Sequence, residues 1–318
     1  MHNKTIRHLR REDREVIYRM RQAGHTQEDI ARALGVVQPT ISKELRRNAG
    51  KRGYRPKQAD EKAQQRQSAK ASRPKVIVGE TRAEVKSRLK LKHSPEQISG
   101  ALKNEGCRGP SHESIYGFIA EDRKAGGELY THLRINGKRR YRRRSKSGRT
   151  KIPNRIPISE RPEIVDARGR FGDWEADLIE GTKGSGYILS LYERKSMFGR
   201  LVKLETKGNL ETSQALIEAL GDYRVHTITY DNGLEFSLHE EVSRRLQAAG
   251  YFCEPYHSWE KGGVENFNGL VRQYFPKGSD FTTIDQQRLS EVESLLNHRP
   301  RKTHGFKRPS DYASQLAA

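Results

Sequence analysis

The spacing of hydrophobic residues along the chain changes near residue 165. Before this point, short segments carry apolar residues every three or four positions, as amphipathic helices do. After it, apolar and polar residues alternate in short runs that are separated by helical segments. Strands that alternate with helices pack as a sheet with helices on its faces. The pattern therefore predicts small helical modules in the first half and an α/β domain over residues 166–318.

Residues 1–50 are expected to form three short helices arranged as a helix-turn-helix domain. The segment TQEDIARAL begins with a threonine cap and an acidic residue three positions later, and Gly35 makes the turn to VQPTISKELRRN. In such proteins the last helix enters the major groove of DNA. A plain three-helix module with a charged solvent face is the alternative, and the basic charge favours DNA binding. The positions expected to contact DNA are Gln38, Thr40, Ser42, Lys43, Arg46 and Arg47.

A second helical module is predicted over residues 86–130. The segment SPEQ is a capping box with proline at the first helical position, and SHESIYGFIA begins with a serine cap. Two capped helices joined by a longer turn resemble a second helix-turn-helix, in which Ser111 and His112 would contact DNA. Helix packing without any DNA contact explains the pattern equally well.

Two basic segments connect these modules. Residues 51–85 are polar with little apolar face, which predicts a basic linker that is in part helical. Residues 131–165 form a second linker or arm, in which KRRYRRRSK has seven basic residues of nine and three prolines follow. This run is either a solvated stretch of charge or an arm that binds phosphates or the minor groove. The arm residues are Lys138, Arg139, Arg140, Arg142, Arg143 and Arg144.

The excess of positive charge lies entirely in the first half. The formal net charge is +21, and residues 1–150 hold 38 basic and 16 acidic residues, against 23 and 24 in residues 151–318. A field of this size attracts polyanions and predicts salt-sensitive binding of nucleic acid. Cys107 and Cys253 lie far apart and imply neither a disulfide framework nor a metal site. No apolar stretch approaches the length of a membrane span, and the N-terminus lacks the apolar core of a signal peptide.

Three acidic residues in the second half suggest metal chemistry. Asp177 ends an alternating run in GDWEADLIEG, and Asp231 closes a β-branched run in TYDNGLEF. Glu265 lies on a helical pattern, with 33 residues between it and Asp231. Carboxylates on two strand ends and one helix can hold two divalent metal ions over a phosphodiester. The alternatives are an Asx turn at Asp231 and an exposed polar helix face at Glu265. Of the neighbouring acids, Glu175 shares the strand face of Asp177 and would support it, and Glu180 is expected to take no part.

Over nearly its full length the chain resembles Asp-Asp-Glu transposases of bacterial insertion sequences, most closely the insertion-sequence-thirty family. The motifs that carry the resemblance are QEDIARALGVVQPTISKELRRN, SPEQISGAL, SHESIYGFI, GDWEADLIEG, the 33-residue gap, YHSWEKGGVENFNGLVRQYFPKG and NHRPRKTHGFKRP. The resemblance implies a ribonuclease-H-like catalytic domain, which is a mixed sheet flanked by helices, with the strands of Asp177 and Asp231 side by side. It also implies catalytic and metal-binding roles for Asp177, Asp231 and Glu265, and a supporting catalytic role for Arg272.

The implied activity is cleavage and strand transfer of DNA for transposition. The protein would bind the terminal inverted repeats of an insertion sequence and use two Mg²⁺ ions, or Mn²⁺, for phosphodiester hydrolysis and transesterification. Asp177 would bridge the two ions. The implied partners are double-stranded DNA and further copies of the chain, since joining two DNA ends requires at least a homodimer. The implied location is the bacterial cytoplasm near the nucleoid, and no membrane partner is implied. Competing readings are a DNA-binding regulator with a silent nuclease-like domain and a nuclease that only hydrolyses DNA.

The sequence departs from the family pattern at three positions near the acidic residues. Asp173, Ala176 and Val264 stand where that pattern has His, Gly and Asn. None of the three changes removes a predicted metal ligand. The tail after residue 275 either closes over the catalytic domain or contacts DNA, and the sequence leaves both open.

Overall fold

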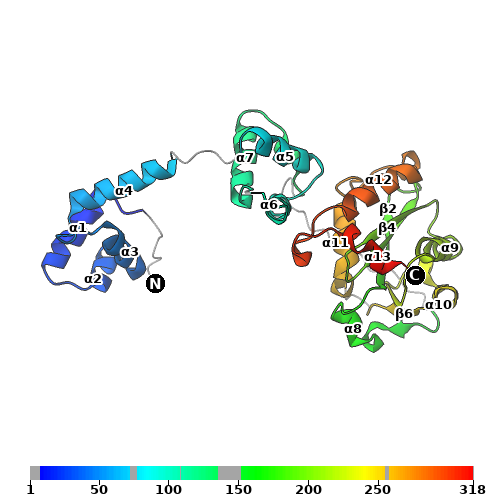
Figure 1. Ribbon diagram of the computed structural model, residues 1–318. Helices are drawn as coiled ribbons and strands as arrows, with labels where there is room; N and C mark the ends of the chain where they lie inside the picture. Colours follow the sequence, from blue (N-terminus) through cyan, green and yellow to red (C-terminus); the bar gives the residue numbers. More distant parts are fainter. Residues whose placement is uncertain (1–7, 72–76, 108, 135–151, 255–257, 318) are drawn as a thin grey trace. The chain divides into compact units, whose positions relative to one another are not determined.

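The structure is a computed structural model that describes residues 8–71, 77–107, 109–134, 152–254 and 258–317. The chain divides into two compact units, Met1–Lys75 and Val76–Ala318 (Figure 1). Each unit has its own buried hydrophobic clusters. Among the described residues, no helix is both long and apolar enough to cross a membrane.

The first unit is a bundle of short helices. Its elements are α1 (Arg11–Gln22), α2 (Gln27–Ala33), α3 (Gln38–Asn48) and α4 (Pro56–Ala71). Ile17, Ile30 and Ile41 are fully buried where the first three helices meet. The predicted capping interaction is present, because the Thr26 hydroxyl accepts from the Asp29 N–H and the Asp29 carboxylate accepts from the Thr26 N–H. The interval 51–85 contains α4, which packs on α1 and α3.

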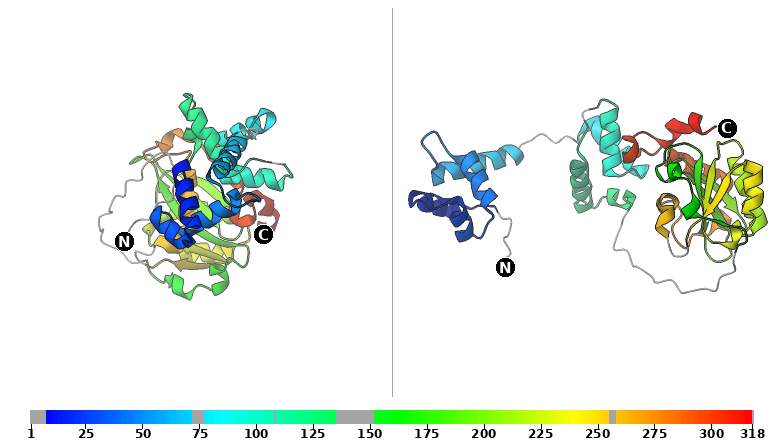
Figure 2. Two further views of the ribbon diagram at one scale, coloured as in Figure 1. Left: turned by 90° about the vertical axis from the view of Figure 1, so that its left-hand side faces the viewer. Right: turned by 90° about the horizontal axis from the view of Figure 1, so that it is seen from below.

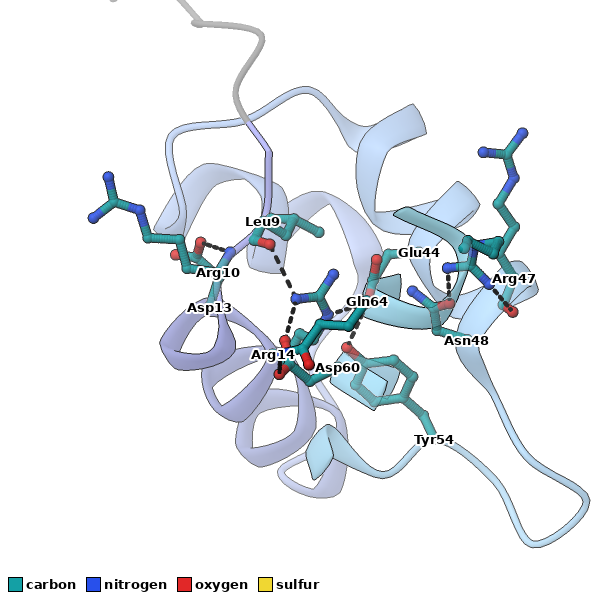
Figure 3. A network of polar contacts seen from close by, with 11 residues as sticks. Leu9, Arg10, Asp13, Arg14, Glu44, Arg47, Asn48, Tyr54, Asp60 and Gln64 are labelled. Atoms are coloured by element: carbon teal, nitrogen blue, oxygen red, sulfur yellow. Dashed lines mark hydrogen bonds and ion pairs between the residues drawn. The ribbon is translucent and has the colours of Figure 1, made fainter. Parts of the chain in front are cut away.

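A buried arginine ties these helices together. Arg14 on α1 donates through Nε to Glu44 on α3 and through Nη1 to Asp60 on α4, both at 2.8 Å (Figure 3). The Tyr54 hydroxyl donates to the same Glu44 oxygen at 3.1 Å. Removing one partner of such a buried pair costs about 3–5 kcal/mol. The network therefore holds the Glu44 side of α3 inward and leaves its opposite side to solvent.

The second unit begins with a small helical module. Its elements are α5 (Gly79–Lys90), α6 (Pro95–Asn104), α7 (His112–Lys124) and the 3₁₀ helix η1 (Leu129–His132). Both predicted caps are present, since the hydroxyls of Ser94 and Ser111 accept from backbone N–H groups of the first turns of α6 and α7. Seven apolar residues form the core of this module: Val85, Leu89, Ile98, Leu102, Ile115, Ile119 and Leu129.

The rest of the second unit is built on a six-stranded sheet of order β1-β6-β5-β2-β3-β4. β2 pairs antiparallel with β3 and β3 antiparallel with β4, while β5, β6 and β1 continue parallel to β2. This is the strand order of a ribonuclease-H-like fold with one added edge strand, so the predicted fold class is confirmed. The strands are β1 (Ile156–Pro157), β2 (Asp173–Glu180), β3 (Tyr187–Glu193), β4 (Gly199–Leu204), β5 (Thr227–Tyr230) and β6 (Ala249–Phe252).

Helices cover both faces of this sheet (Figures 1 and 2). The larger ones are α9 (Asn209–Leu220), α10 (His239–Leu246), α11 (Gly262–Val271) and α12 (Gln286–Asn297), and α8 (Glu163–Asp166) and α13 (Ala313–Leu316) are single turns. Trp174 and Ala176 pack on the side of α9 and α10, whereas Ile179 packs with Phe267 of α11. Because neighbouring residues of a strand point to opposite faces, Glu175 and Asp177 share the α11 side.

Two details of the strands differ from the sequence interpretation. Asp177 lies within β2 and not at its end, because the strand continues to Glu180. The sequence pattern also predicts a strand over residues 251–257, YFCEPYH, of which 255–257 lie outside the described residues; the strand in the structure, β6, is displaced and runs from Ala249 to Phe252. In both cases pairing with neighbouring strands, which sequence periodicity does not specify, determines where the strand ends.

Candidate active site

The three predicted acidic residues are carried by neighbouring elements of the second unit. Asp177 lies in β2, and Asp231 directly follows β5, the parallel neighbour of β2. Glu265 lies in the first turn of α11, which packs across β2 and β3. The fold thus brings together residues that lie up to 88 positions apart in the chain.

A buried lysine connects two of these carboxylates. Lys261, the residue before α11, is 5% exposed, and its Nζ donates to Asp177 Oδ1 and to the Ala176 carbonyl, each at 3.2 Å. The same Nζ lies 3.8 Å from Asp231 Oδ2. Burial opposes the charged form of Lys261, but the charges of Asp231 and Asp177 outweigh it, and its pKa is raised. A positive charge therefore sits between the two aspartates.

Asp177 is also held by an amide and a hydroxyl. Its Oδ2 accepts from Asn268 Nδ2 at 2.6 Å, and Asn268 Oδ1 accepts from Ser190 Oγ at 2.7 Å. Ser190 is the β3 residue paired with Asp177 across the sheet. Burial raises the pKa of Asp177, Asp231 raises it further, and Lys261 opposes both. The carboxylate is therefore fixed in place and short of positive charge.

Glu265 and a fourth acid, Glu235, belong to the same electrostatic cluster. Burial and the charge of Asp177 raise the pKa of Glu265. Burial raises the pKa of Glu235 as well, and the charges of Asp231 and Asp177 add to it. The sequence interpretation missed Glu235, although its position four residues after Asp231 in DNGLEF was a usable signal.

Asp231 uses its two oxygens differently. Its Oδ1 accepts from the Gly233 N–H at 3.0 Å, so the Asx turn considered for this motif is present. Its other oxygen, Oδ2, faces Lys261. The next side chain, Asn232, donates to the Cys253 carbonyl at 2.7 Å and accepts from Arg155. The turn therefore orients the carboxylate toward the site, and the structural and chemical interpretations of TYDNG are compatible.

The side chain of Glu175 lies between β2 and α11 and supports the site by contacting this helix. It is fully buried, forms an ion pair with Arg194, and accepts from the Val264 N–H at 2.7 Å. A buried carboxylate of β2 thus holds the first turn of the helix that carries Glu265. The sequence predicts that Glu175 supports Asp177. In the structure Glu175 positions α11 against β2, which is an indirect form of this support.

The contacts of Arg272 with other described residues do not include Asp177, Asp231 or Glu265. It follows α11, donates to the Glu180 carbonyl at 2.6 Å and to the Pro276 carbonyl at 3.4 Å, and lies 5.9 Å from the ring centre of Phe281. These contacts attach the end of α11 to the end of β2. The side chain of Glu180 itself is exposed.

The donor set of this site fits a hard divalent cation. Within the described ranges, no group of three or more His, Cys, Asp or Glu residues is arranged to hold a metal ion. However, the clustered groups are oxygen donors, which suit Mg²⁺ or Mn²⁺ better than Zn²⁺. Burial and repulsion from neighbouring carboxylates raise the pKa values of Asp177 and Glu265, and Lys261 opposes both shifts. Added cations would relieve that repulsion.

The predicted DNA-contacting residues of the first unit lie on the outer side of α3. Lys43, Arg46 and Arg47 are exposed. Gln38 is also exposed and donates to Gln27 Oε1 at 2.9 Å, and Thr40 and Ser42 are half-buried. In the second unit, Ser111 and His112 are exposed at the start of α7. The basic arm of Lys138, Arg139, Arg140, Arg142, Arg143 and Arg144 lies outside the described residues.

Comparisons with known proteins give a consistent picture. Residues 5–48 match a family of helix-turn-helix domains. The chain is 41% identical over 315 residues to the transposase for insertion sequence element IS4351 of Bacteroides fragilis, which covers 98% of this chain and 96% of that protein. It is 36% identical over 325 residues to the transposase InsI for insertion sequence element IS30A of Escherichia coli (strain K12), covering 97% and 84%.

Among solved structures, the catalytic core domain of BIV integrase is similar at a TM-score of 0.35 and 20% identity. The match covers 44% of this chain and 91% of that one. The order and directions of the strands, and not this likeness, establish the fold of the second unit.

Proposed function

The chain belongs to the IS30 family of insertion-sequence transposases, and we propose that Asp177, Asp231 and Glu265 form the site at which it cleaves and joins DNA strands. The observation that carries the proposal is the convergence of these carboxylates from two adjacent parallel strands and α11, with Lys261 between two of them. A cluster of acids that repel one another and enclose a cation suits a site that binds further cations. We further propose that its DNA substrate is the pair of terminal inverted repeats of its own insertion sequence.

Two Mg²⁺ ions held by Asp177, Asp231 and Glu265 would supply Lewis-acid stabilisation of the attacking and leaving oxygens. The protein groups around them have distinct tasks. Asn268 fixes one oxygen of Asp177, and the Asx turn fixes one oxygen of Asp231. Glu175 fixes the turn of α11 that carries Glu265. These contacts hold the carboxylates in place before DNA binds, which lowers the reorganisation needed for reaction.

The reaction takes two steps of one type. In the first, the oxygen of water attacks phosphorus at the element end, the P–O3′ bond breaks, and the strand leaves with a free 3′-OH. In the second, that 3′-OH attacks a phosphodiester of the target, a new P–O3′ bond forms, and the target strand leaves with its own 3′-OH. Because both steps replace one oxygen of a phosphodiester by another, one carboxylate site serves both.

We propose that the outer side of α3 reads the element ends and that the basic residues of 131–165 bind the phosphate backbone. Exposed Lys43, Arg46 and Arg47 support the first role. Joining two ends to one target requires two sites, so we expect at least a homodimer on DNA. The place of action would be the cytoplasm, on chromosomal DNA.

Asp231→Asn tests the assignment of the site. The variant keeps the Asx turn and the volume of the side chain but removes its negative charge. We expect cleavage of element-end duplex in Mg²⁺ to be abolished, with DNA affinity at moderate salt unchanged. A variant that cleaves at the parental rate would remove Asp231 from the active site. Tight end binding without cleavage in the parent would instead indicate a DNA-binding regulator.

A further inference from the structure

A polar cavity lies on the other side of α11 from the carboxylate cluster. It has a volume of about 260 Å³, far more than one water molecule needs. It lies among α6, α11 and the segment after α12, where Gln97 of α6 donates to the Pro300 carbonyl at 2.8 Å. Figure 1 shows this segment passing beside α6. The charged residues that line the cavity are Arg134, Arg299, Arg301 and Lys302, and none of the described residues that line it is acidic.

The floor of the cavity contains two buried arginines for which the described part of the chain provides no carboxylate partner. Arg299 is 3% exposed, and its hydrogen bonds within the described ranges go to two neutral acceptors, Gln97 Oε1 at 2.8 Å and Gln273 Oε1 at 2.7 Å. Arg301 is 7% exposed and donates to the Leu296 carbonyl at 3.1 Å, while its Nε has no hydrogen-bond partner among the described residues. Buried charges are normally paired, so this arrangement lacks an anion.

The surroundings confirm a locally positive potential. Burial lowers the pKa of Arg299 to about 10, and the charges of Arg301 and Arg134 contribute to the shift. Burial and nearby arginines, Arg299 first, also lower the pKa of the neighbouring His93 to about 3. Lys302 at the rim forms an ion pair with Glu96 at 3.1 Å. An anion of suitable size would be stabilised here by several donors at once.

We propose that this cavity binds one backbone phosphate of the DNA on which the carboxylate site acts. Arg299 and Arg301 would bind it from the floor, and exposed Arg134 and Lys302 from the rim. The inference rests on the proposed function, because α11 joins the two sites: Asn266, which accepts from Arg134 at 2.9 Å and lines the cavity, directly follows Glu265. DNA that reaches from one face of α11 to the other would place a phosphate in the cavity.

Arginine suits this ligand better than lysine does. A guanidinium group presents its N–H donors in a planar fork that matches two phosphate oxygens, and it keeps its charge when buried. A phosphate contact of this kind positions DNA without reading its sequence. It would also connect the module of α5–α7 to the catalytic domain, since Arg299 is bonded to Gln97 of α6. The cavity would thus align the DNA held by one module with the chemistry of the other.

A scan of neutral phosphate substitutions tests the proposal. Fluorescence anisotropy in EDTA would measure binding of the full-length protein to element-end duplexes in which one phosphate at a time is a methylphosphonate. In the parent, substitution at the phosphate bound by the cavity should reduce affinity about tenfold. In the Arg301→Gln and Arg134→Gln variants, the same methylphosphonate substitution in the DNA should cause no further loss of affinity. Arg245→Gln on α10 removes the same charge from an exposed site and should keep the parental pattern.

Unchanged penalties at every position in both Arg301→Gln and Arg134→Gln would overturn the proposal. Arg134 is exposed, so its variant gives a result even if Arg301→Gln does not fold. Thermal melting with inorganic phosphate tests the alternative that the cavity binds free phosphate and not a DNA phosphate. Stabilisation of the parent but not of Arg301→Gln by phosphate, together with unchanged methylphosphonate penalties, would identify a site for free phosphate and also overturn the proposal. Because binding is read without metal, a failure of DNA cleavage would overturn the proposed function and leave this result intact.

Discussion

The ammonium nitrogen of Lys261 lies 3.2 Å from Oδ1 of Asp177, inside the cluster of acids. Both groups are largely buried, with side-chain exposures of 7% and 22%. The lysine therefore compensates part of the carboxylate charge in the metal-free protein, where uncompensated repulsion would destabilise the fold. In the proposed site, metal ions would bind the same carboxylates that Lys261 contacts, so we expect their effects on stability to be coupled.

Lys261→Met should make the fold depend on divalent cations. We expect the variant in EDTA to lose on the order of 2 kcal/mol of stability, less than a fully buried pair because the Asp231 side chain is 42% exposed. Adding Mg²⁺ should raise its melting temperature more than that of the parent. Thermal melting in EDTA and in Mg²⁺ measures both effects. An equal response of parent and variant to Mg²⁺ would show that Lys261 and metal are not coupled.

Glu175→Gln should impair both folding and cleavage. It removes the ion pair with Arg194, which costs about 3 kcal/mol for buried groups, and weakens the anchor of α11 at Val264. Chemical unfolding measures the first effect, and cleavage well below the unfolding transition measures the second.

Glu293→Gln is the matched control for this variant. Glu293 of α12 is held in the same way, by Arg200 and by the Leu201 N–H, but it supports a helix that carries none of the proposed catalytic carboxylates. Its pair with Arg200 is partly exposed, so the variant should lose about 1 kcal/mol and keep its cleavage rate. Equal cleavage rates for Glu175→Gln and Glu293→Gln would contradict the role assigned to Glu175.

Lys43→Ala and Arg46→Ala should each weaken binding to element ends. Both side chains are exposed on α3, and loss of one phosphate or base contact typically costs about 1–3 kcal/mol. Affinity measured at several salt concentrations separates the two kinds of contact, since a lost phosphate contact lowers the salt slope by about 1. Arg32→Ala on α2 also removes an exposed arginine and serves as the control. Unchanged end binding in both α3 variants would exclude this helix from recognition.

His93 should make the second unit sensitive to acid. Its pKa of about 3 in the folded protein lies below the ordinary value of 6.5, so the folded state binds fewer protons than the unfolded state between these values. The contribution of His93 to the free energy of unfolding is therefore complete above about pH 6.5 and is lost as the pH falls toward 3. Urea unfolding followed by circular dichroism should show a smaller difference between pH 7.5 and pH 5 in His93→Gln than in the parent. The control His112→Gln, an exposed residue of α7, should keep the parental difference; equal differences in all three proteins would contradict this.

Local signals made the helices predictable from the sequence. Thr26, Ser94 and Ser111 cap helices where their motifs indicated, because a capping interaction spans only a few residues. The alternation around Trp174 likewise indicated a strand with two distinct faces. The choice of Asp177 rested on its place at the end of the alternating run and on the family resemblance, whereas in the structure the strand continues to Glu180.

The remaining features depend on residues that are distant in the sequence. No sequence pattern distinguished Lys261 in WEKGG from the other charged residues. The fold places it between two aspartates. The alternation placed Glu175 on the same strand face as Asp177, but it did not show that α11 covers that face and buries Glu175 completely. Arg299 and Arg301 belong to the tail motif NHRPRK, and the sequence left open whether this tail packs on the catalytic domain or contacts DNA. In the structure both arginines line the cavity beside α6. Such contacts have no periodicity that a sequence pattern could reveal.

The most direct test of the proposed active site is a cleavage and strand-joining assay on labelled duplexes that carry the element ends. It compares the parent, Glu265→Gln and the exposed control Glu180→Gln, each in Mg²⁺ and in EDTA. We predict metal-dependent cutting and joining in the parent and in Glu180→Gln, and a loss of about two orders of magnitude or more in Glu265→Gln. Cutting and joining by Glu265→Gln at the parental rate, or in EDTA, would contradict the account.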